Sequence, residues 1–432
     1  FGNPLSSHAQ NKIDLNEIII ESSEHKTARE KEKNALEDIV FLSRTEVRHV
    51  GSRGAGEILK RLPGIIVQGP PMAYRNAKIN GLDKEYQSIM IDGHRPAGGE
   101  DRRDFKLDRL PANLLGGVEV IYNPSVVYGG SAPAGIINLI SLDVHEKRVL
   151  GGDFAMDYSD THSGFYPEGS LYYGNNINDL GFLLYFGRSG YTRNDNLRLM
   201  DSDTGISGLQ EEVSIVSLST ALARIAYKVN ENNRLKLKVF WSDQDQQEDI
   251  LANVKRRTSG GLSVRQDSSG ETASLRLLMT ELSHELNLAK WKGLTKIAYD
   301  WSWMDKEKNR LREKDPDWEI SREAEGQQLH LLSSRSDWSS IPFHTGEIQH
   351  RLKTGASWSM NSRDFNRMAY LKISDHKFWD EVENGSYNLA ENFFAGYLLD
   401  EIELGGHVIS PGLRIENHHR NYSTAEANGN TN

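Results

Sequence analysis

The chain has 432 residues, of which 26% are charged, with a formal net charge of −10, no cysteine and a mean hydropathy of −0.59. This length predicts two domains, and no apolar run approaches the ~18 uncharged residues that a membrane-spanning helix needs. The acidic balance argues against a general nucleic-acid-binding protein, and the lack of cysteine excludes thiol catalysis, disulfides and cysteine-ligated zinc. Membrane-spanning β-strands stay possible, because each needs only ~10 residues of alternating character.

The N-terminal segment, residues 1–38, contains a short apolar island, Leu15–Ser22, within a charged stretch. Two interpretations are open: a strand of the domain that follows, or a flexible peptide that adds as a strand to the sheet edge of a partner. The charge-dense Glu24–Glu37 after it is typical of a mobile tether. Before it, Ser7-His8-Ala9 fits the end of a signal peptide as well as an ordinary polar terminus.

A compact α/β unit is predicted for residues 39–145. Arg53–Leu62 has apolar residues at helical spacing and is ended by Pro63-Gly64, so we expect a helix there. Asp92-Gly93 predicts a tight turn, since glycine tolerates positive φ, and Leu110–Leu115 predicts a second short helix. The glycine pair Gly129-Gly130 is not followed by the Lys-Ser/Thr of a phosphate loop, so we expect no nucleotide site. Expected strands are 65–67, 88–91, 118–122 and 135–141, and expected loops are 69–75 and 96–104.

After residue 145, segments of alternating apolar and polar residues recur. In Arg234–Trp241 the apolar residues fall on one face and the basic ones on the other, and Thr295–Trp303 and Gln349–Met360 repeat the pattern. Side chains alternate between the two faces of a strand, so each segment has one apolar and one polar face. We expect about eleven such strands, at 150–158, 165–174, 180–191, 217–229, 234–243, 272–285, 293–305, 326–340, 346–360, 392–404 and 407–417.

The connections between these strands alternate between short and long, which is typical of outer-membrane barrels. Short turns are expected at 175–179, 230–233, 287–292, 341–345 and 405–406, and long loops at 192–216, 242–271, 306–325 and 361–391. Aromatic residues near strand ends fit the girdles at a membrane surface: Tyr191, Trp241, Trp291, Trp303 and Trp358. Because an unpaired strand edge is costly in lipid, such a sheet must close.

Several motifs occur in an order and spacing that resemble the plug domain of TonB-dependent outer-membrane receptors, over Ile39–Ser141. They are Glu57–Ile65, Ile79-Asn80-Gly81, Ile89–Arg95, Val118–Ile121, Val127-Tyr128-Gly129 and Gly135–Ile140. The resemblance implies an α+β plug domain (residues 39–145) followed by a transmembrane antiparallel β-barrel. That barrel is of the twenty-two-stranded type, so eleven strands at 146–432 would be its N-terminal half.

The resemblance also implies a function. Such receptors lie in the Gram-negative outer membrane, bind a scarce small-molecule substrate, and are driven by the TonB energy-transducing protein through an N-terminal box. In this chain the box would be Glu17, Ile18, Ile19, Ile20 and Glu21. A ferric siderophore or similar iron chelate is the expected substrate, with oligosaccharide, haem or cobalamin as alternatives. We expect no catalytic residues, cofactor or nucleic-acid partner.

Candidate substrate contacts lie in the two plug loops that would face outward. Arginine forks suit carboxylates and other anionic groups, although each of these side chains is equally consistent with a solvated loop charge. The candidates are Tyr74, Arg75, Glu100, Arg102 and Arg103.

The plug–barrel latch differs from the family pattern. Asn80 and Asn123 stand where arginines usually help to hold the plug, so that role is not transferred to them. Glu119 matches the pattern and is a candidate latch residue. Two alternatives remain for the rest of the latch: Arg95, Arg102 or Arg109 replace the missing arginines, or the plug is held more loosely.

The chain has fourteen histidines, and the adjacent pair His418-His419 would point to opposite faces of a strand, so no metal site is expected. A signalling receptor of the same fold, or a soluble or surface adhesion protein built on a β-sandwich, are the alternatives from other functional classes.

Overall fold

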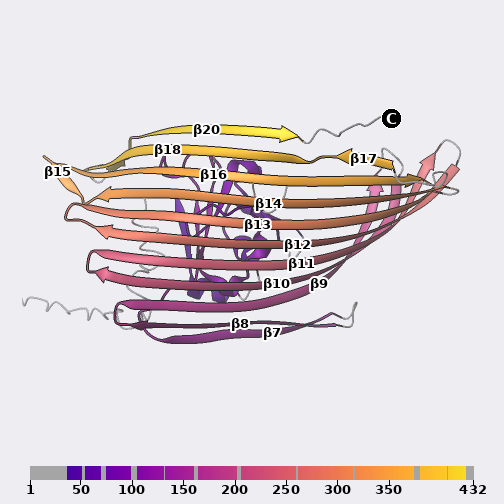
Figure 1. The fold of residues 1–432 in the computed structure, drawn as a ribbon, viewed down its shortest axis with the longest axis horizontal. Helices are drawn as coiled ribbons and strands as arrows, with labels where there is room; N and C mark the ends of the chain where they lie inside the picture. The colour runs from indigo at the N-terminus through magenta and orange to yellow at the C-terminus, as the bar shows by residue number, and fades with distance from the viewer. Residues whose placement is uncertain are drawn as a thin grey trace, which may run out of the picture.

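The computed structural model describes residues 37–50, 54–69, 74–98, 105–130, 132–159, 164–201, 206–258, 261–314, 317–373, 380–405 and 407–424. The expected box at residues 17–21 and the loop residues Glu100, Arg102 and Arg103 lie outside these ranges. A small mixed α/β unit at the N-terminal end packs against one face of a large antiparallel sheet (Figure 1). We call the small unit the plug and the large sheet the wall.

The plug is built on a four-stranded sheet of order β1-β5-β6-β4. Strand β5 pairs antiparallel with β1 and β6, whereas β4 runs parallel to β6. A separate hairpin is formed by β2 and β3. The bounds are β1 Ile39–Ser43, β2 Ile65–Gln68, β3 Asn76–Ile79, β4 Gln87–Ile91, β5 Leu115–Ile121 and β6 Gly135–Ser141, with 3₁₀ turns η2 Lys84–Tyr86, η3 Leu107–Arg109 and η4 Ala112–Leu114.

Two short helices cover this sheet. Helix α2 (Arg44–His49) begins with a capping box, in which Ser43 and Glu46 each bind the other's backbone N–H. Helix α3 (Ala55–Leu59) is shorter than the predicted Arg53–Leu62, and it buries Ile58 and Leu59 completely. The second predicted helix, 110–115, is only the 3₁₀ turn η4. The length of both helices was overestimated. A few apolar residues at helical spacing are also found in single helical turns, in which the same side chains are buried.

The predicted turn at Asp92-Gly93 is confirmed. Both residues have positive φ, 55° and 75°, and the flanking Ile91 and His94 exchange backbone hydrogen bonds of 2.8 and 3.0 Å. These are the features of a two-residue type I′ hairpin turn. The turn projects Asp92 and His94 beyond the edge of the plug's core.

The wall contains eleven long antiparallel strands, as expected from the alternation. They are β7 Val149–Ser159, β8 Gly164–Ile177, β9 Leu180–Asp201, β10 Ile206–Asn230, β11 Asn233–Thr258, β12 Gly261–Asn287, β13 Trp291–Lys314, β14 Asp317–Ser340, β16 Ile348–Ile373, β18 Tyr387–Leu404 and β20 Gly412–Thr424. Short strands flank them: β15 Phe343–Thr345, β17 Asp380–Asn384 and β19 His407–Ile409.

The predicted long loops are wrong. Residues 206–216, 242–258 and 306–314 continue the strands, and the β10–β11 register runs without a break from Ile206↔Arg256 to Lys228↔Arg234. Much of this sequence is polar on both faces, as in Asp243–Asp249, so it lacks the regular alternation by which a strand is recognised in sequence. Pairing with both neighbours nevertheless satisfies their backbone groups. The short turns at 178–179, 231–232 and 288–290 are confirmed.

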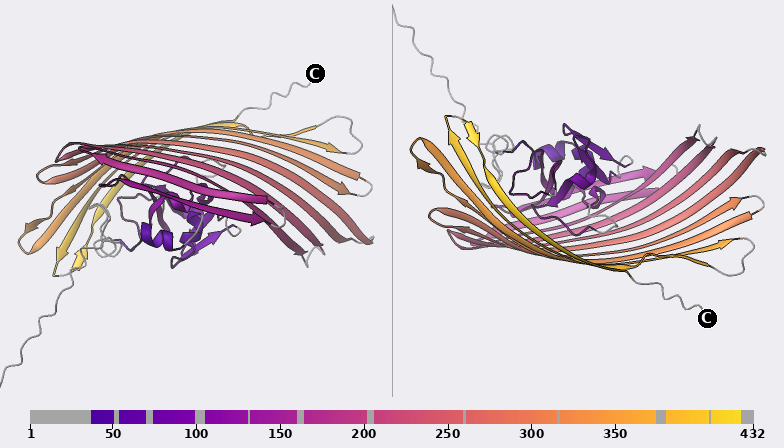
Figure 2. Two further views of the ribbon diagram at one scale, coloured as in Figure 1. Left: turned by 90° about the horizontal axis from the view of Figure 1, so that it is seen from below. Right: turned by 90° about the horizontal axis from the view of Figure 1, so that it is seen from above.

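The wall is curved, and the plug lies on its concave side, against the half nearest the short turns (Figure 2). Alternate side chains on each strand therefore face the plug: Lys238, Ser242 and Gln244 of β11 are buried, whereas Asp245 and Gln247 are exposed. Among the described residues, the edge strands β7 and β20 do not pair with each other. No described helix is long and apolar enough to cross a membrane.

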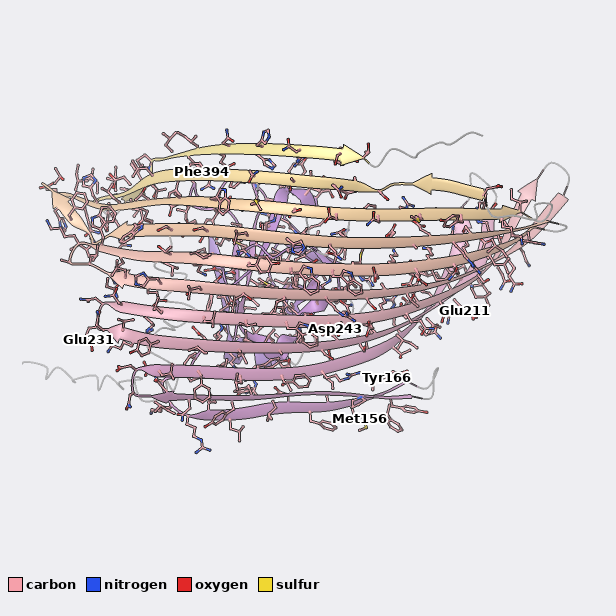
Figure 3. The ribbon with its side chains drawn as sticks, in the orientation of Figure 1. Met156, Tyr166, Glu211, Glu231, Asp243 and Phe394 are labelled. Atoms are coloured by element: carbon pink, nitrogen blue, oxygen red, sulfur yellow. The ribbon has the colours of Figure 1, made fainter. Side chains whose placement is uncertain are left out.

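The convex, outer face carries an apolar band near the short turns. Large apolar side chains such as Phe154, Ile297 and Phe394 are 75%, 51% and 56% exposed there, which is the arrangement that a lipid-facing surface requires. Figure 3 labels Phe394 near the short turns and Glu211 farther along the strands. Of the predicted girdle residues, Tyr191 is an exception: it lies on the inner face near Arg75 and Asp108 of the plug.

Substituting Gly135 should loosen the plug. Gly135 has φ of +129°, and an added Cβ would lie 2.6 Å from the Ile121 carbonyl oxygen and 2.8 Å from a methyl carbon of Ile79. We expect Gly135→Ala to destabilise the plug by about 1–3 kcal/mol, seen as faster proteolysis of residues 37–141 in the detergent-solubilised protein. Gly130→Ala, where the nearest atom is 3.9 Å away, is the matched control. Equal proteolysis of the two variants would contradict this expectation.

Candidate functional site

The tight turn of the plug is held by three cationic side chains of the wall. Arg224 of β10 and Lys238 of β11 approach the Asp92 carboxylate at 2.8 and 3.1 Å. Lys296 of β13 donates to the Asp92 backbone carbonyl at 2.8 Å. Three wall strands therefore converge on one turn of the plug.

Two further carboxylates balance these cations. Glu281 of β12 lies 3.6 Å from Lys238 and 3.2 Å from Lys296, and Asp143, which follows the plug, lies 3.3 Å from Arg224. With Asp92 they form a set of three acids and three bases, which we call the Asp92 cluster. Buried charges are tolerated when they are paired and hydrogen-bonded in this way.

Asp92 is ionised within this cluster. Burial by itself would raise the pKa of its carboxyl group, but the charges of Arg224 and Lys238 and two hydrogen bonds from Ser141 outweigh burial and hold the pKa well below its usual range. Asp143 behaves likewise: burial opposes its ionisation, and Arg224 lowers its pKa. The cluster is therefore an electrostatic clamp whose carboxylates stay charged.

A second set of contacts lies beside the cluster. His94 Nε2 is 2.8 Å from Asp300 Oδ2 of β13, and the Ala97 backbone N–H donates to the same oxygen at 3.1 Å. Ser302, two residues along β13, donates to the Gly98 carbonyl at 3.5 Å. The segment after the turn is thus held along one strand of the wall.

A third set holds the opposite side of the plug. Arg335 of β14 donates to the Val127 carbonyl at 3.1 Å, and Arg414 of β20 donates to the Val126 carbonyl at 3.2 Å. Glu416 of β20 accepts from the Gly130 N–H at 3.3 Å. The plug is therefore bound by directional polar contacts to the middle strands of the wall and to its C-terminal edge strand β20.

The candidate latch residue Glu119 lies within the plug. Its carboxylate accepts a 3.0 Å hydrogen bond from Asn138, whose side-chain oxygen accepts from the Gly93 N–H at 2.8 Å. Glu119 is thereby connected to the tight turn through Asn138. Asn80 has φ of 52° and takes part in a turn after β3.

The residues that hold the plug were missed in the sequence. Lys238 and Lys296 lie on the polar face of segments recognised as strands, but nothing in the sequence shows that this face meets Asp92. One signal in the sequence could have indicated them: Lys238 and Lys296 lie on strand segments that are expected to cross the membrane. A charge at that depth needs a partner inside the barrel.

The outward side of the plug carries Arg75 and Tyr74, the two described candidates for substrate contact. Arg75 donates to Gln246 of β11 at 2.6 Å and to Asp108 at 3.2 Å, so it bridges the plug and the wall. Tyr74 lies close to Lys60, which donates to its hydroxyl at 3.0 Å. The structure thus brings Arg75 to the inner face of the wall, whereas Tyr74 contacts the plug itself.

Beyond Arg75, the inner face of the wall is lined with paired charges. Glu271 of β12 lies between Lys306 and Lys308 of β13, at 3.0 and 3.2 Å, and Arg367 of β16 pairs with Glu325 of β14 at 3.4 Å. This part of the inner face is therefore charged, with its charges paired. Within the described ranges, no group of three or more His, Asp or Glu side chains is arranged to hold a metal ion.

Comparison with known proteins agrees with this architecture. Residues 31–136 match the TonB-dependent Receptor Plug Domain family. The whole fold is similar to that of the outer membrane transporter YddB from Escherichia coli, with a TM-score of 0.55 and 12% identity, over 89% of this chain and 57% of that one. The chain carries the plug domain and barrel strands of a TonB-dependent receptor. The matched plug family belongs to receptors of the Gram-negative outer membrane, and it is non-enzymatic.

Other similar proteins differ in the substrate that they are named for. The vitamin B12 transporter BtuB of Vibrio vulnificus (strain YJ016) is 25% identical over 164 residues, which is 36% of this receptor and 25% of that protein. A variant of the ferric enterobactin receptor PfeA from Pseudomonas aeruginosa matches over 88% of this chain and 81% of that one, with 11% identity and a TM-score of 0.39. The receptor thus aligns with about a quarter of the B12 transporter.

Neutralising Asp92 should release the plug. Asp92→Asn removes the charge that faces Arg224 and Lys238, and breaking a buried ion pair on one side costs about 3–5 kcal/mol. We expect cells that carry this variant to become several-fold more sensitive to vancomycin, which is too large for ordinary porins. Asp83→Asn, which loses only an exposed ion pair with Lys78, is the control. Unchanged sensitivity of the Asp92 variant would exclude the cluster as a clamp.

The clamp should also be independent of pH over the physiological range. A carboxylate whose pKa falls on folding stabilises the folded state above its unfolded pKa of ~4, and this contribution is lost only as pH falls through the folded value. Because the pKa of Asp92 is well below its usual range, we expect equal leak conductance in planar bilayers at pH 8 and pH 5. A rise in conductance at pH 5 would show that another group controls the plug.

Proposed function

We propose that this receptor imports a scarce polar substrate across the outer membrane, with the plug as a removable stopper. The observation that carries the proposal is the way in which the plug is held. It is bound to the inner face through ion pairs and hydrogen bonds at Asp92, His94 and the Val126–Val127 carbonyls. Such contacts are each worth only about 1–3 kcal/mol when water can replace them. Apolar side chains of the wall, such as Leu222 and Phe240, also pack with the plug core. In this proposal the plug leaves and returns by giving up both kinds of contact while the wall stays folded.

The proposed partner is the TonB energy-transducing protein. The box Glu17–Glu21 lies ahead of β1, which is an edge strand of the plug sheet. A pull on residues 1–36 therefore reaches the plug through β1. An aliphatic peptide that pairs with the sheet edge of a partner would supply main-chain hydrogen bonds for this pull.

The proposed substrate is a ferric siderophore or a similar iron chelate. Arg75 stands at the outward side of the plug beside Gln246, and Lys306 and Lys308 follow on the inner face of β13. Cationic side chains in this position favour a substrate with carboxylate or other anionic groups. Tyr74, Glu100, Arg102 and Arg103 are proposed as further contacts, and Glu119 as a support of the latch through Asn138.

Cobalamin is the second candidate, because the aligned Vibrio relative is named a vitamin B12 transporter. Haem and oligosaccharides are further alternatives. Growth of a deletion strain on single iron sources, on vitamin B12 and on oligosaccharides, with and without the cloned receptor, would distinguish them. Growth that depends on the receptor for an iron chelate supports the proposal. Dependence only on vitamin B12 or on a carbon source would replace the substrate and retain transport, and no dependence on any would contradict import.

Deleting Glu17–Glu21 should separate binding from transport. The deletion leaves the plug and wall intact, so we expect substrate binding to whole cells at the wild-type level and uptake below a tenth of it. Binding and uptake of radiolabelled substrate are measured on the same cells. Deleting five residues of the charged tether, Lys26–Glu30, is the control, and it should leave uptake unchanged. Normal uptake after the first deletion would contradict the box assignment.

A further inference from the structure

The two lysines of the Asp92 cluster each have one partner on the plug and a second partner on the wall. Lys238 lies 3.1 Å from the Asp92 carboxylate and 3.6 Å from that of Glu281. Lys296 donates to the Asp92 backbone carbonyl at 2.8 Å and lies 3.2 Å from the Glu281 carboxylate. Withdrawal of the turn would therefore remove one partner from each lysine and leave both lysines with Glu281.

The position of Glu281 is set by the wall itself. Glu281 and Lys238 lie directly opposite each other in the antiparallel pair of β12 and β11, so their side chains share the inner face. Glu281 is buried, and its Oε2 atom, the one nearer to Lys238, has no hydrogen-bond partner among the described residues. This oxygen is an acceptor that Lys238 could take up once Asp92 leaves.

Arg224 has the same double arrangement. It contacts the carboxylate of Asp92 at 2.8 Å and that of Asp143 at 3.3 Å. Asp143 lies in the connection between β6, which ends the plug, and β7, which begins the wall. The next residue, Val144, lies against β9, where a Cβ added to Gly181 would come within 2.5 Å of a Val144 methyl carbon. The connection is therefore packed on the wall beside the point where Asp143 meets Arg224.

These second partners affect the free energy of plug withdrawal in two ways. Removing one member of a buried ion pair is strongly unfavourable, because the other charge is left uncompensated. Here the three cations keep two acids after Asp92 has left, so this penalty is reduced. While the plug is in place, Glu281 and Asp92 are two negative charges that face the same ammonium group of Lys238, and their mutual repulsion weakens the clamp.

We propose that Glu281 is a positioning residue for plug release, which takes over the two lysines as Asp92 withdraws. Asp143 does the same for Arg224. The inference rests on the proposed function, in which the plug leaves the wall. It predicts the opposite of what a supporting role for Glu281 predicts. Loss of a supporting acid would loosen the plug, whereas loss of a replacing acid makes withdrawal harder.

The test measures how fast the plug leaves when residues 1–36 are pulled. The receptor is held in a supported bilayer, an N-terminal tag is attached to a force probe, and the rate of plug withdrawal is recorded at constant load without substrate. We expect Glu281→Gln to slow withdrawal by about tenfold, as the loss of one charge-assisted hydrogen bond from the released state would give. Glu281→Asp, which keeps the charge, should restore a rate close to that of the wild type.

A double-mutant comparison separates replacement from simple support. Asp92→Asn removes the charge with which Glu281 competes, so Glu281→Gln should no longer slow withdrawal in that background. Such non-additivity is expected of two groups that share a partner. Asp143→Asn removes the acid that would remain with Arg224 and should slow withdrawal in the wild-type background. It carries the test if Glu281→Gln does not fold.

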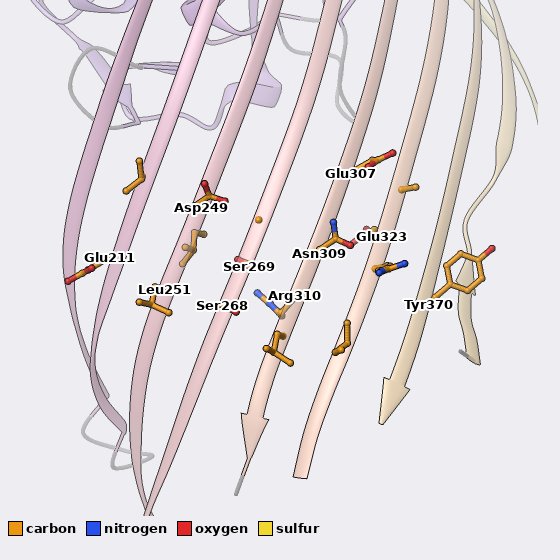
Figure 4. Close-up of a pocket in the computed structure, with 17 residues that line it drawn as sticks. Glu211, Asp249, Leu251, Ser268, Ser269, Glu307, Asn309, Arg310, Glu323 and Tyr370 are labelled. Carbon is orange, nitrogen blue, oxygen red and sulfur yellow. The ribbon is translucent and has the colours of Figure 1, made fainter. Parts of the chain in front are cut away.

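Two control variants should keep the wild-type rate. Glu285→Gln removes an acid four residues along the same face of β12, where it pairs with Lys236 at 2.8 Å instead of with the cluster. Glu307→Gln removes a negative charge from the outward part of β13, where Glu307 lines a hollow of about 980 Å³ well beyond Lys296 (Figure 4). Together they control for the change in the net charge of the wall.

Faster or unchanged withdrawal in both Glu281→Gln and Asp143→Asn would overturn the inference and leave the proposed function intact. Equal slowing by Glu281→Gln in the Asp92→Asn background would also overturn it, because Glu281 would then act on something other than the clamp. If the wild-type plug did not leave at any load below the one that unfolds the wall, the proposed function itself would fail. Resistance to sodium dodecyl sulfate at room temperature confirms a folded wall in each variant.

Discussion

The pairing of the Asp92 carboxylate with Arg224 and Lys238 is the interaction on which the arrangement of plug and wall depends. A two-residue turn places this charge beyond the plug core, and burial of an unpaired carboxylate there would be prohibitive. The wall supplies three cations from three strands, together with Glu281 to balance them. These ion pairs therefore favour one position of the plug against the wall.

The two faces of the wall meet different environments, lipid on the outside and the plug and water on the inside. Its outer face is apolar over the stretch that meets lipid, and its inner face combines buried apolar side chains, such as Leu222, Phe240 and Leu277, with the charged side chains that hold the plug. Lys238, on the inner face, is neighboured along β11 by the lipid-facing Leu237 and Val239. The alternation of strand side chains makes this possible without any change in backbone pairing. It also explains why the wall can continue outward as polar strands once the lipid ends.

The strand pattern and the plug motifs were readable because they depend on local chemistry. Eleven strands, their short turns and the Asp92-Gly93 turn follow from alternation and from glycine's backbone freedom. The outward strand extensions were mistaken for loops, since Asp243–Asp249 has no apolar face to show its period. Arg75 was predicted as a substrate contact, and the structure shows it between the plug and the wall, bound to Asp108 and Gln246. Tyr191 was taken for a membrane-surface aromatic, although it lies near Arg75 and Asp108 of the plug. Glu100, Arg102 and Arg103 lie outside the described residues, so their predicted roles stay predictions.

By itself, the amino-acid sequence determined the two-part organisation, the strand period and the turn that carries Asp92. These depend on the spacing of apolar residues and on backbone conformations that a short segment sets for itself. Only the tertiary structure decided which charges meet. Asp92 is separated from Arg224, Lys238 and Lys296 by more than a hundred residues, and their contact follows from the curvature and register of the wall. A local pattern cannot specify such a contact, because the pairing energy arises only when the plug is enclosed.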